Sequence, residues 1–301
     1  MLMLGYRDPG YADSLSAYGT PRRLAHSGGW ILERSIPGTP HQDGMGLYPM
    51  LSCEDWAGLA VDLEALREEG FVSLVCVSDP FLEAPGCDPF LGFDTTRPFK
   101  IHYAAHLDRP VEQIVSRHHA VHARKAAGNL GVEAAEEPLT YLDEWHDLYS
   151  MLIARHGIRD LRRFSKESFR KLLGVPGVCL MRALHDGTAV GAQVFVQQGD
   201  VVHAHLAAFS PAGYSHGASY LLDWQALNYF TGKARVLNWG GGVAASPEDG
   251  LKDYKRGWST HEYTSFLHGA VLDPGRYADL SGVEFPGFAG YFPAYRRGEF
   301  G

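Results

Sequence analysis

The pattern of apolar and polar positions is clearest over residues 179–258, where short apolar runs alternate with turns and one helix. His185–Thr188 separates the first two runs, and its Asp-Gly pair favours the positive φ angles of a tight hairpin. Residues 210–217 are predicted to form a loop, because they are rich in Gly, Pro and Ser. Ala218–Tyr229 has apolar residues at helical spacing. The predicted strands are Cys179–Leu184, Ala189–Gln197, Val201–Phe209 and Ala234–Trp239, the last followed by Gly240-Gly241-Gly242.

The earlier part of the chain shows weaker but similar periodicities. Glu54–Glu69 has an apolar stripe that predicts a helix, and Gly70 is placed to end it. A further helix is predicted from Val111 to about Gly128, with Asp108 as its cap and Pro110 in its first turn. Other predicted helices are Tyr141–Gly157 and Ser165–Leu173, and other predicted strands are Gly29–Ser35, Phe71–Val77 and Phe99–Leu107. The order of elements in the first half echoes that of the second, which indicates a duplicated α/β unit.

Composition limits the class of protein. The chain has 301 residues, of which 45% are hydrophobic and 21% charged, values that are typical of a globular protein with one large or two smaller domains. Its net charge of −8 argues against coating of DNA through bulk charge. Four cysteines without a CxxC pair suggest neither a zinc site nor a disulfide framework. With no signal-peptide pattern and no apolar run long enough to span a membrane, we expect a cytoplasmic protein.

Three segments together resemble a known group of enzymes. The first is Leu107–Ile114, continued by 124–128 and 131–133, the second runs from Ser210 through Gly217 to Trp224, and the third runs from Leu237 through the glycines to Trp258. They resemble, in this order, signatures of the Fem-type transferases, and the resemblance covers roughly residues 105–265. The first signature in that family links two copies of the GNAT acyltransferase fold.

This resemblance implies an α/β fold of two tandem GNAT-like units, each a mixed, largely antiparallel sheet flanked by helices. The units are expected at residues 1–130 and 131–275, with a tail at 276–301 that packs back on the body. The implied activity is transfer of an aminoacyl group from aminoacyl-tRNA to an amine, with no tightly bound cofactor. The implied acceptor is a cell-wall precursor or a small natural-product amine.

One departure concerns the donor. GNAT enzymes that use acetyl-CoA carry a Gln/Arg-x-x-Gly-x-Gly/Ala loop, whereas this chain has Tyr214 at the first position and Ser219 at the last. The difference favours a donor other than CoA. An acyl-CoA-dependent N-acyltransferase and a non-catalytic GNAT-like binding protein stay open as alternatives.

The candidate catalytic residues are Lys255, His205 and His203. Aminolysis of an ester needs a deprotonated amine and stabilisation of the developing oxyanion. Lys255 follows the glycine-rich strand end, and the matching lysine of the resembled family acts on the donor carbonyl or its leaving group; a solvated surface charge is the alternative. His203 and His205 alternate on one predicted strand, so both are expected on the same face, where either is a candidate proton acceptor. Buried structural histidines are the alternative.

Several further residues are candidates for donor binding. Gly217, Ala218 and Ser219 begin a predicted helix, with Ser219 as a possible cap, and backbone N–H groups at such a terminus hold anions. Gly240 and Gly241 allow close approach of a ligand, and Trp239 is placed to line its pocket. The basic stretch 155–171, with Arg162 and Arg163, is suited to phosphates of tRNA or CoA. His118, His119 and His122 lack a third ligand at suitable spacing and are interpreted as a polar helix face, not a metal site.

Overall fold

The computed structural model describes residues 4–84, 86, 88–158, 163–241, 250–283 and 290–299. The chain forms two compact units. Unit 1 is Lys100–Tyr263 with a short N-terminal segment that ends at Gly5, and unit 2 is Tyr6–Phe99 with Thr264–Gly301. These bounds differ from the expected ones at residues 130 and 275. The reason is that two long strands, β5 (Thr95–His106) and β11 (His261–Val271), each continue from one unit into the other.

Unit 1 contains a mixed sheet in which antiparallel pairs predominate. Its strands follow the order β5-β10-β9-β8-β7-β6, and only β9 and β10 pair in parallel within this set. The parallel pair is joined through helix α8, as a strand–helix–strand crossover requires. The strands besides β5 are β6 (Gly131–Ala134), β7 (Val178–His185), β8 (Thr188–Gln198), β9 (Val201–Phe209) and β10 (Val236–Gly241). The predicted α/β class is confirmed.

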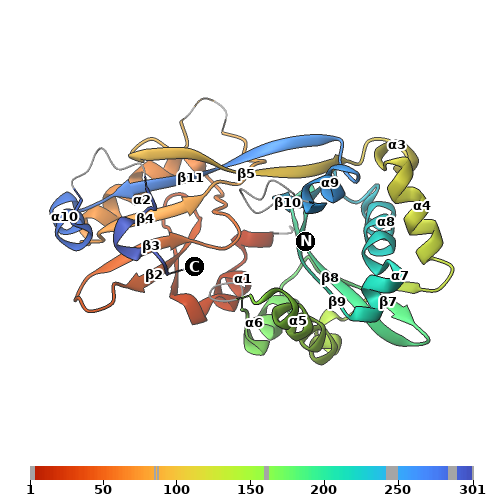
Figure 1. Cartoon of the computed structure of the whole chain (residues 1–301). Coiled ribbons are helices and arrows are strands. Elements are labelled where there is room, and N and C mark those ends of the chain that lie inside the picture. The colour runs from red at the N-terminus through yellow and green to blue at the C-terminus, as the bar shows by residue number, and fades with distance from the viewer. Residues whose placement is uncertain are drawn as a thin grey trace. The chain divides into compact units, whose positions relative to one another are not determined.

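Helices cover both faces of this sheet. Figure 1 shows α4 and α8 on one side of the strands and α5 and α6 on the other. The helices of unit 1 are α3 (Val111–Ile114), α4 (Arg117–Ala126), α5 (Leu142–His156), α6 (Lys166–Leu173), α7 (Pro211–His216), α8 (Ala218–Phe230) and α9 (Gly250–Arg256), with a 3-10 turn at Pro138–Tyr141. Helix α6 is capped by Ser165, whose hydroxyl accepts from the Ser168 N–H.

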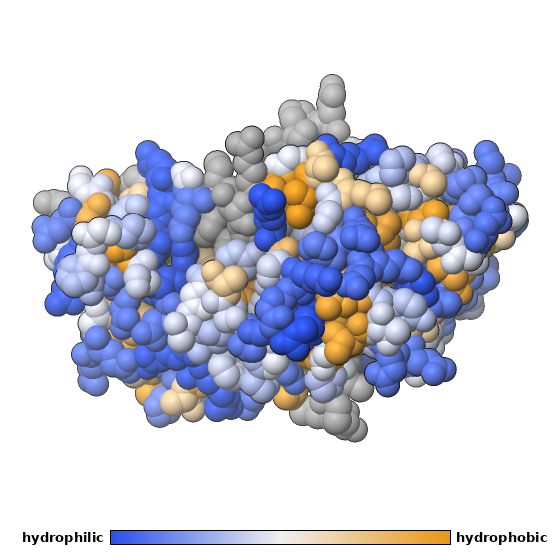
Figure 2. Space-filling model, turned by 90° about the horizontal axis from the view of Figure 1, so that it is seen from below, coloured by the Kyte–Doolittle hydropathy of each residue, from blue (hydrophilic) through white to orange (hydrophobic). Residues whose placement is uncertain are grey.

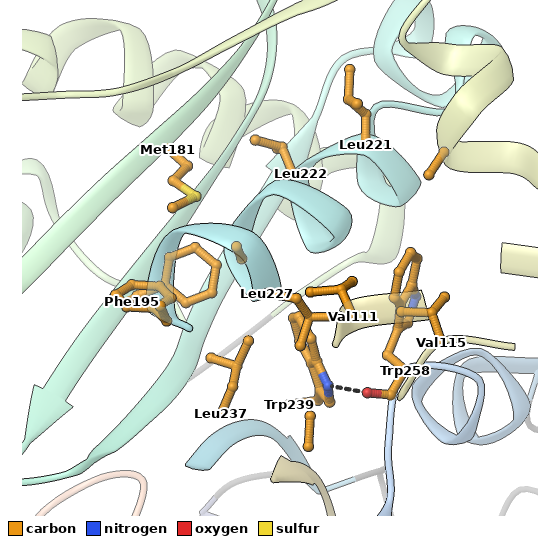
Figure 3. Packing of buried hydrophobic residues seen from close by; sticks show 14 of the residues in the cluster. Val111, Val115, Met181, Phe195, Leu221, Leu222, Leu227, Leu237, Trp239 and Trp258 are labelled. Atoms are coloured by element: carbon orange, nitrogen blue, oxygen red, sulfur yellow. Dashed lines mark hydrogen bonds between the residues drawn. The ribbon is translucent and has the colours of Figure 1, made fainter. Parts of the chain in front are cut away.

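The main core of unit 1 lies between the sheet and helices α4 and α8. Phe195 of β8, Leu222 and Leu227 of α8, and Trp258 are all fully buried in it. In Figure 3, Phe195 lies beside Leu237 of β10 and Trp258 lies beside Trp239 of the same strand. Burial of one such side chain contributes about 1.5–3 kcal/mol, so this contact fixes the position of α8 over the strands.

Three local predictions in unit 1 are wrong. The helix expected over 111–128 is two helices, because Val115 is extended and Ser116 caps α4 by accepting from the His119 N–H. Asp108 does not cap α3, and its carboxylate accepts from the Arg109 guanidinium instead. Residues 211–216, expected in a loop, form α7, because Pro211 suits a first helical turn and the Ser210 hydroxyl accepts from the Gly213 N–H.

The hairpin between β7 and β8 and the helix stop at Gly70 are confirmed. Asp186 and Gly187 have φ angles of 49° and 77°, as a tight turn of this type requires. Gly70 has φ +84° and follows Glu69, the C-cap of α2 (Leu59–Glu68).

Unit 2 is also built around a sheet, in the order β1-β2-β3-β4-β11. A buried ion pair joins its C-terminal segment to β3, because the Arg296 guanidinium donates to both carboxylate oxygens of Asp43 at 2.6 and 2.8 Å. The remaining elements of unit 2 are α1 (Pro9–Ser14), β1 (Thr20–Arg23), β2 (Trp30–Ser35), β3 (Gln42–Gly46), β4 (Ser73–Val77) and α10 (Pro274–Ser281), with 3-10 turns at Gly5–Arg7, Ser16–Tyr18, Trp56–Gly58 and Ala294–Arg296.

On the face seen in Figure 2 the hydrophobic residues form separate groups among hydrophilic ones. No helix in the described ranges combines the length and the apolar composition needed to cross a membrane.

Candidate active site

A cavity of about 590 Å³ opens in unit 1 where β9 and β10 stop pairing. The parallel ladder joins Val201–His203 to Val236–Asn238 and ends there. The next residues on both strands, Ala204–Ala207 of β9 and Trp239 of β10, line the cavity. Its other walls come from Leu152, His156, Gln193, Phe209, Tyr214, Ser219, Asp223, Gly250, Leu251, Tyr254, Lys255 and Trp258. The separation of two strands therefore creates a site that four helices enclose.

A β-bulge in β9 shapes the inner wall. Val194 of β8 pairs with Leu206, and Phe195 pairs with Ala204, so His205 is an extra residue between them. A bulge of this kind re-aims side chains, and it brings four consecutive residues of β9 to the cavity where a regular strand would bring every second one. The alternation on which we placed His203 beside His205 is broken here. Among the described residues, the cavity lining includes His205 and does not include His203.

His203 is buried beside Asn238 and is not among the described residues that line the cavity. Its Nδ1 lies 3.0 Å from the Asn238 amide nitrogen, which is also 3.2 Å from Nδ1 of His102. The Asn238 Oδ1 accepts from the Gly240 N–H at 2.9 Å. Asn238, which is 1% exposed, therefore fixes the backbone of β10 at Gly240. Burial lowers the pKa of both His203 and His205 to about 3, so both rings are neutral at pH 7 and hold an added proton weakly.

Lys255 lies against Gly240 and Gly241, the last residues of β10, where the register of β10 with β5 shifts. Its Nζ donates to the Gly241 carbonyl at 3.0 Å. Gly240 has φ +75°, which glycine adopts without strain, and a Cβ added there would lie 3.6 Å from the Lys255 Nζ. The structure thus brings Lys255 to both predicted glycines. Gly242 and Arg162 lie outside the described residues.

Trp239 and Trp258 join the end of β10 to the segment that follows α9. The Trp239 Nε1 donates to the Trp258 carbonyl at 2.9 Å, as Figure 3 shows. Both rings also belong to the main core, so the cavity wall that they form is anchored in the fold.

The segment 214–219 has a different structure from the expected loop. Gly217, with φ +73°, ends α7 and begins α8, and Ser219 does not cap α8. Tyr214 and Ser219 line the cavity, whereas Ala218 is fully buried in the core. The Arg155 guanidinium lies 4.1 Å from the centre of the Tyr214 ring, so one residue of the basic stretch is placed at this wall. Arg163 is exposed, and Arg170 pairs with Glu167 on the surface.

Asp223 is a site residue that we did not predict. It lies one helical turn after Ser219, lines the cavity and is 5% exposed. The Tyr254 hydroxyl donates to its Oδ2 at 2.6 Å, and Gln193 also hydrogen bonds to it. Burial raises the pKa of Asp223 to about 7, although the bonds from Tyr254 and Gln193 and the charge of Lys255 act in the opposite direction. A carboxyl of this pKa exchanges protons near neutral pH.

A signal for Asp223 was present in the sequence. The residue interrupts an apolar helix between Leu222 and Trp224, and carboxyls are seldom fully buried without a partner or a role. Tyr254, its partner, is partly buried against the core, and desolvation raises the pKa of its hydroxyl well above the usual value. It therefore remains a hydrogen-bond donor to Asp223 across the physiological pH range.

The histidines of α4 differ in their exposure. Among the described residues, no group of three His, Cys, Asp or Glu side chains is arranged to hold a metal ion. The interpretation as a polar helix face is only partly right, because His119 is buried with its ring 5.0 Å from that of Trp258. An added Cβ at Gly257 would lie 2.1 Å from the His119 ring, so this glycine makes room for it.

Comparisons with known proteins agree with this architecture. Residues 116–256 match the model of a family described as acetyltransferase (GNAT) domain. The chain is an acyltransferase with a GNAT fold. The matched range contains β9, the bulge, α8 and α9, and therefore most of the cavity wall. A search of curated protein sequences finds no significant match.

Solved structures extend the likeness of this acyltransferase beyond the matched domain. The structure of FemX has a TM-score of 0.69 and 13% identity, and the match covers 90% of this chain and 93% of that one. The C-terminal domain of a putative lysylphosphatidylglycerol synthetase from Agrobacterium fabrum has a TM-score of 0.61 and 13% identity, covering 90% of each chain. L-PGS from Bacillus licheniformis has a TM-score of 0.57 and 12% identity, covering 90% of this chain and 94% of that one. These matches confirm the resemblance to the Fem-type fold.

Proposed function

We propose that this acyltransferase moves an aminoacyl group from aminoacyl-tRNA to the amine of an acceptor and forms an amide. The observation that carries the proposal is one cavity with a cation at one wall and a buried carboxyl at another. Lys255 sits at the glycines that end β10, and Asp223 lies on α8 with the Tyr254 hydroxyl bound to it. Aminolysis of an ester requires groups of both kinds.

The reaction follows from these positions. The acceptor nitrogen attacks the ester carbonyl of the aminoacyl group, and a C–N bond forms while the bond to the ribose oxygen breaks. The Lys255 ammonium stabilises the negative charge that develops on the carbonyl oxygen or on the leaving ribose oxygen. The proton lost by the nitrogen needs an acceptor, and Asp223 is better matched to this role than His205, whose pKa is about 3.

Two features support a tRNA donor. The segment 214–219 departs from the CoA-binding pattern and forms the junction of two helices. In addition, Arg155 lies over Tyr214 and His156 lines the cavity, so basic side chains are available at this wall for the phosphates of a tRNA end. The solved structures with the same fold include one described as a putative lysylphosphatidylglycerol synthetase, and this agrees with an aminoacyl group as the cargo. A cell-wall precursor or another primary amine is the proposed acceptor.

The matched family model favours a second candidate, N-acylation with acetyl-CoA as donor. Transfer assays with the purified protein separate the two. tRNA charged with radioactive amino acids and radioactive acetyl-CoA are each offered with a panel of primary amines, and labelled amide is measured. Transfer from charged tRNA supports the proposal, while transfer only from acetyl-CoA contradicts it.

The variant Lys255→Ala tests the cation. We expect the rate of transfer to fall by about 100-fold or more, because loss of one group that stabilises an oxyanion costs roughly this much. Lys252→Ala is the matched control, since Lys252 is an exposed lysine of the same helix. If the two variants lose activity equally, Lys255 has no special role.

A further inference from the structure

We propose that Asp223 and Gln193 form a binding site for a primary ammonium group in the wall of the cavity. The inference rests on the proposed function only for the identity of the molecule that carries the ammonium, which is either the aminoacyl donor or the acceptor. The site itself follows from the hydrogen-bonding capacity of the buried groups.

Both residues line the same cavity. An ionised carboxylate has about four lone-pair positions and no donor. Asp223 receives one bond from Tyr254 and one from Gln193, so it retains capacity for further donors. Because a carboxylate only accepts, the Gln193 amide must turn its NH₂ group toward Asp223, and its Oε1 is the other acceptor.

The Gln193 Oε1 shows that a donor is missing. Gln193 is 6% exposed, and within the part of the chain that the structure describes its Oε1 is buried without a hydrogen-bond partner. A buried acceptor left unsatisfied destabilises the fold, so native proteins seldom keep one without a reason. A ligand that donates a hydrogen bond here would remove this destabilisation.

The chemistry of the cavity selects the kind of donor. A primary ammonium has three N–H groups and a positive charge, so it can serve Asp223 and Gln193 together and neutralise the buried carboxylate. A hydroxyl brings one donor and no charge, and a quaternary ammonium brings charge without donors. The rings of Trp239 and Trp258 line the same cavity and suit both a cation and the carbon chain attached to it.

Electrostatic repulsion from the Lys255 ammonium disfavours a second cation in the cavity. The charge of Lys255 nevertheless ranks below burial and below the bonds of Tyr254 and Gln193 among the causes that set the pKa of Asp223. Its Nζ is bound to the Gly241 carbonyl at the end of β10, whereas Asp223 is carried by α8. The cavity thus has a cationic group for a carbonyl oxygen and an anionic group for an ammonium.

Binding of small amines tests the inference without turnover. Dissociation constants of n-butylammonium, L-alaninamide and the neutral control 1-butanol are measured by NMR titration of the whole protein at pH 7.5. We expect the tighter of the two ammonium ligands to bind at least 10-fold more tightly than 1-butanol. Asp223→Asn should weaken its binding at least 10-fold and Gln193→Leu several-fold. The control Asp186→Asn removes an exposed carboxylate of the same unit and should change nothing.

Each result has a defined meaning. If 1-butanol binds as tightly as the ammonium ligands, or if Asp223→Asn and Asp186→Asn behave alike, the inference is wrong. The comparison with 1-butanol uses the wild-type protein, so it decides even where Asp223→Asn fails to fold. Tighter binding of L-alaninamide assigns the site to the α-ammonium of the donor, and tighter binding of n-butylammonium assigns it to the acceptor.

The same titrations separate this inference from the proposed function. Binding that depends on Asp223 in a protein that transfers no aminoacyl group would refute the proposed function alone. Transfer of aminoacyl groups by a protein whose amine binding is indifferent to Asp223 would refute the inference alone.

Discussion

Replacing Asp223 by asparagine should make the stability of the protein less dependent on pH. Burial raises the pKa of this carboxyl from 3.8 to about 7 in the folded state. A carboxyl with a raised pKa stabilises the fold most when it is protonated in both states, below about pH 4. That stability is lost as the pH rises through 7, because ionisation is easier in the unfolded chain. Asparagine has nearly the same shape, and its oxygen can still accept from Tyr254.

The size of the effect follows from the shift. The difference between 3.8 and about 7 is roughly 3 pKa units, and at 1.36 kcal/mol per unit it corresponds to about 4 kcal/mol well above pH 7. Part of this loss is complete by pH 5.5, where the unfolded carboxyl is already ionised. Between pH 5.5 and 8.5 the same two pKa values predict a further loss of about 2 kcal/mol in the free energy of unfolding.

The assay is urea unfolding of the wild-type protein and Asp223→Asn at pH 5.5 and 8.5, followed by tryptophan fluorescence and circular dichroism. Because the chain has two compact units, the variants are compared with one another at each pH instead of being read as absolute stabilities. We expect the wild type to lose about 2 kcal/mol more than Asp223→Asn over this range. The control Asp186→Asn should follow the wild type. Parallel pH dependences of the wild type and Asp223→Asn would show that the carboxyl has an ordinary pKa.

Three further variants test the packing around the site. Gly213→Ala places a Cβ 2.0 Å from the Val190 carbonyl oxygen, so we expect α7 to shift and thermal unfolding to report a loss of about 1–3 kcal/mol; an unchanged Tm would mean that α7 does not lie close on β8. Gly240→Ala forces a side chain into φ +75° and should lower the free energy of unfolding in urea by about 1–2 kcal/mol. It should also lower the transfer rate. The control is Gly187→Ala in the β7–β8 turn, which should leave the transfer rate unchanged. Arg182→Met removes a 7% exposed cation bound to Glu144 at 2.5 Å, and we expect a loss of about 2 kcal/mol in urea unfolding that 1 M salt does not reproduce in the wild type.

The fold was largely predictable where the sequence is periodic. Val201–Phe209 was predicted with the observed bounds, and Ala218–Tyr229 and the Asp-Gly hairpin differ from the structure by at most one residue. Local patterns predict such elements, because burial of one face and the φ angles of a tight turn depend on residues that are neighbours in sequence. The break at Val115–Ser116 was missed since apolar spacing continues across it, and only the cap at Ser116 shows that a new helix begins.

The candidate site was predictable only in part. Lys255, His205, Tyr214, Ser219 and Trp239 do line one cavity, but their roles remain predictions. The bulge at His205 depends on how β8 pairs with β9, and no pattern within β9 announces it. Asp223 interrupts an apolar helix, but its place in a site depends on Gln193 and Tyr254. These residues lie far away in sequence and meet Asp223 only in the folded unit.

The division of the chain has a consequence for its synthesis. Unit 2 consists of two separate segments, and the strand that completes its sheet, β11, pairs with β4 from the far end of the chain. The Arg296–Asp43 ion pair also joins the two segments. On the ribosome, where domains fold as their residues emerge, Tyr6–Phe99 must therefore wait with the β4 edge unpaired while all of unit 1 is made. The residues of unit 1 emerge between the two segments, so unit 1 can close around its cavity first.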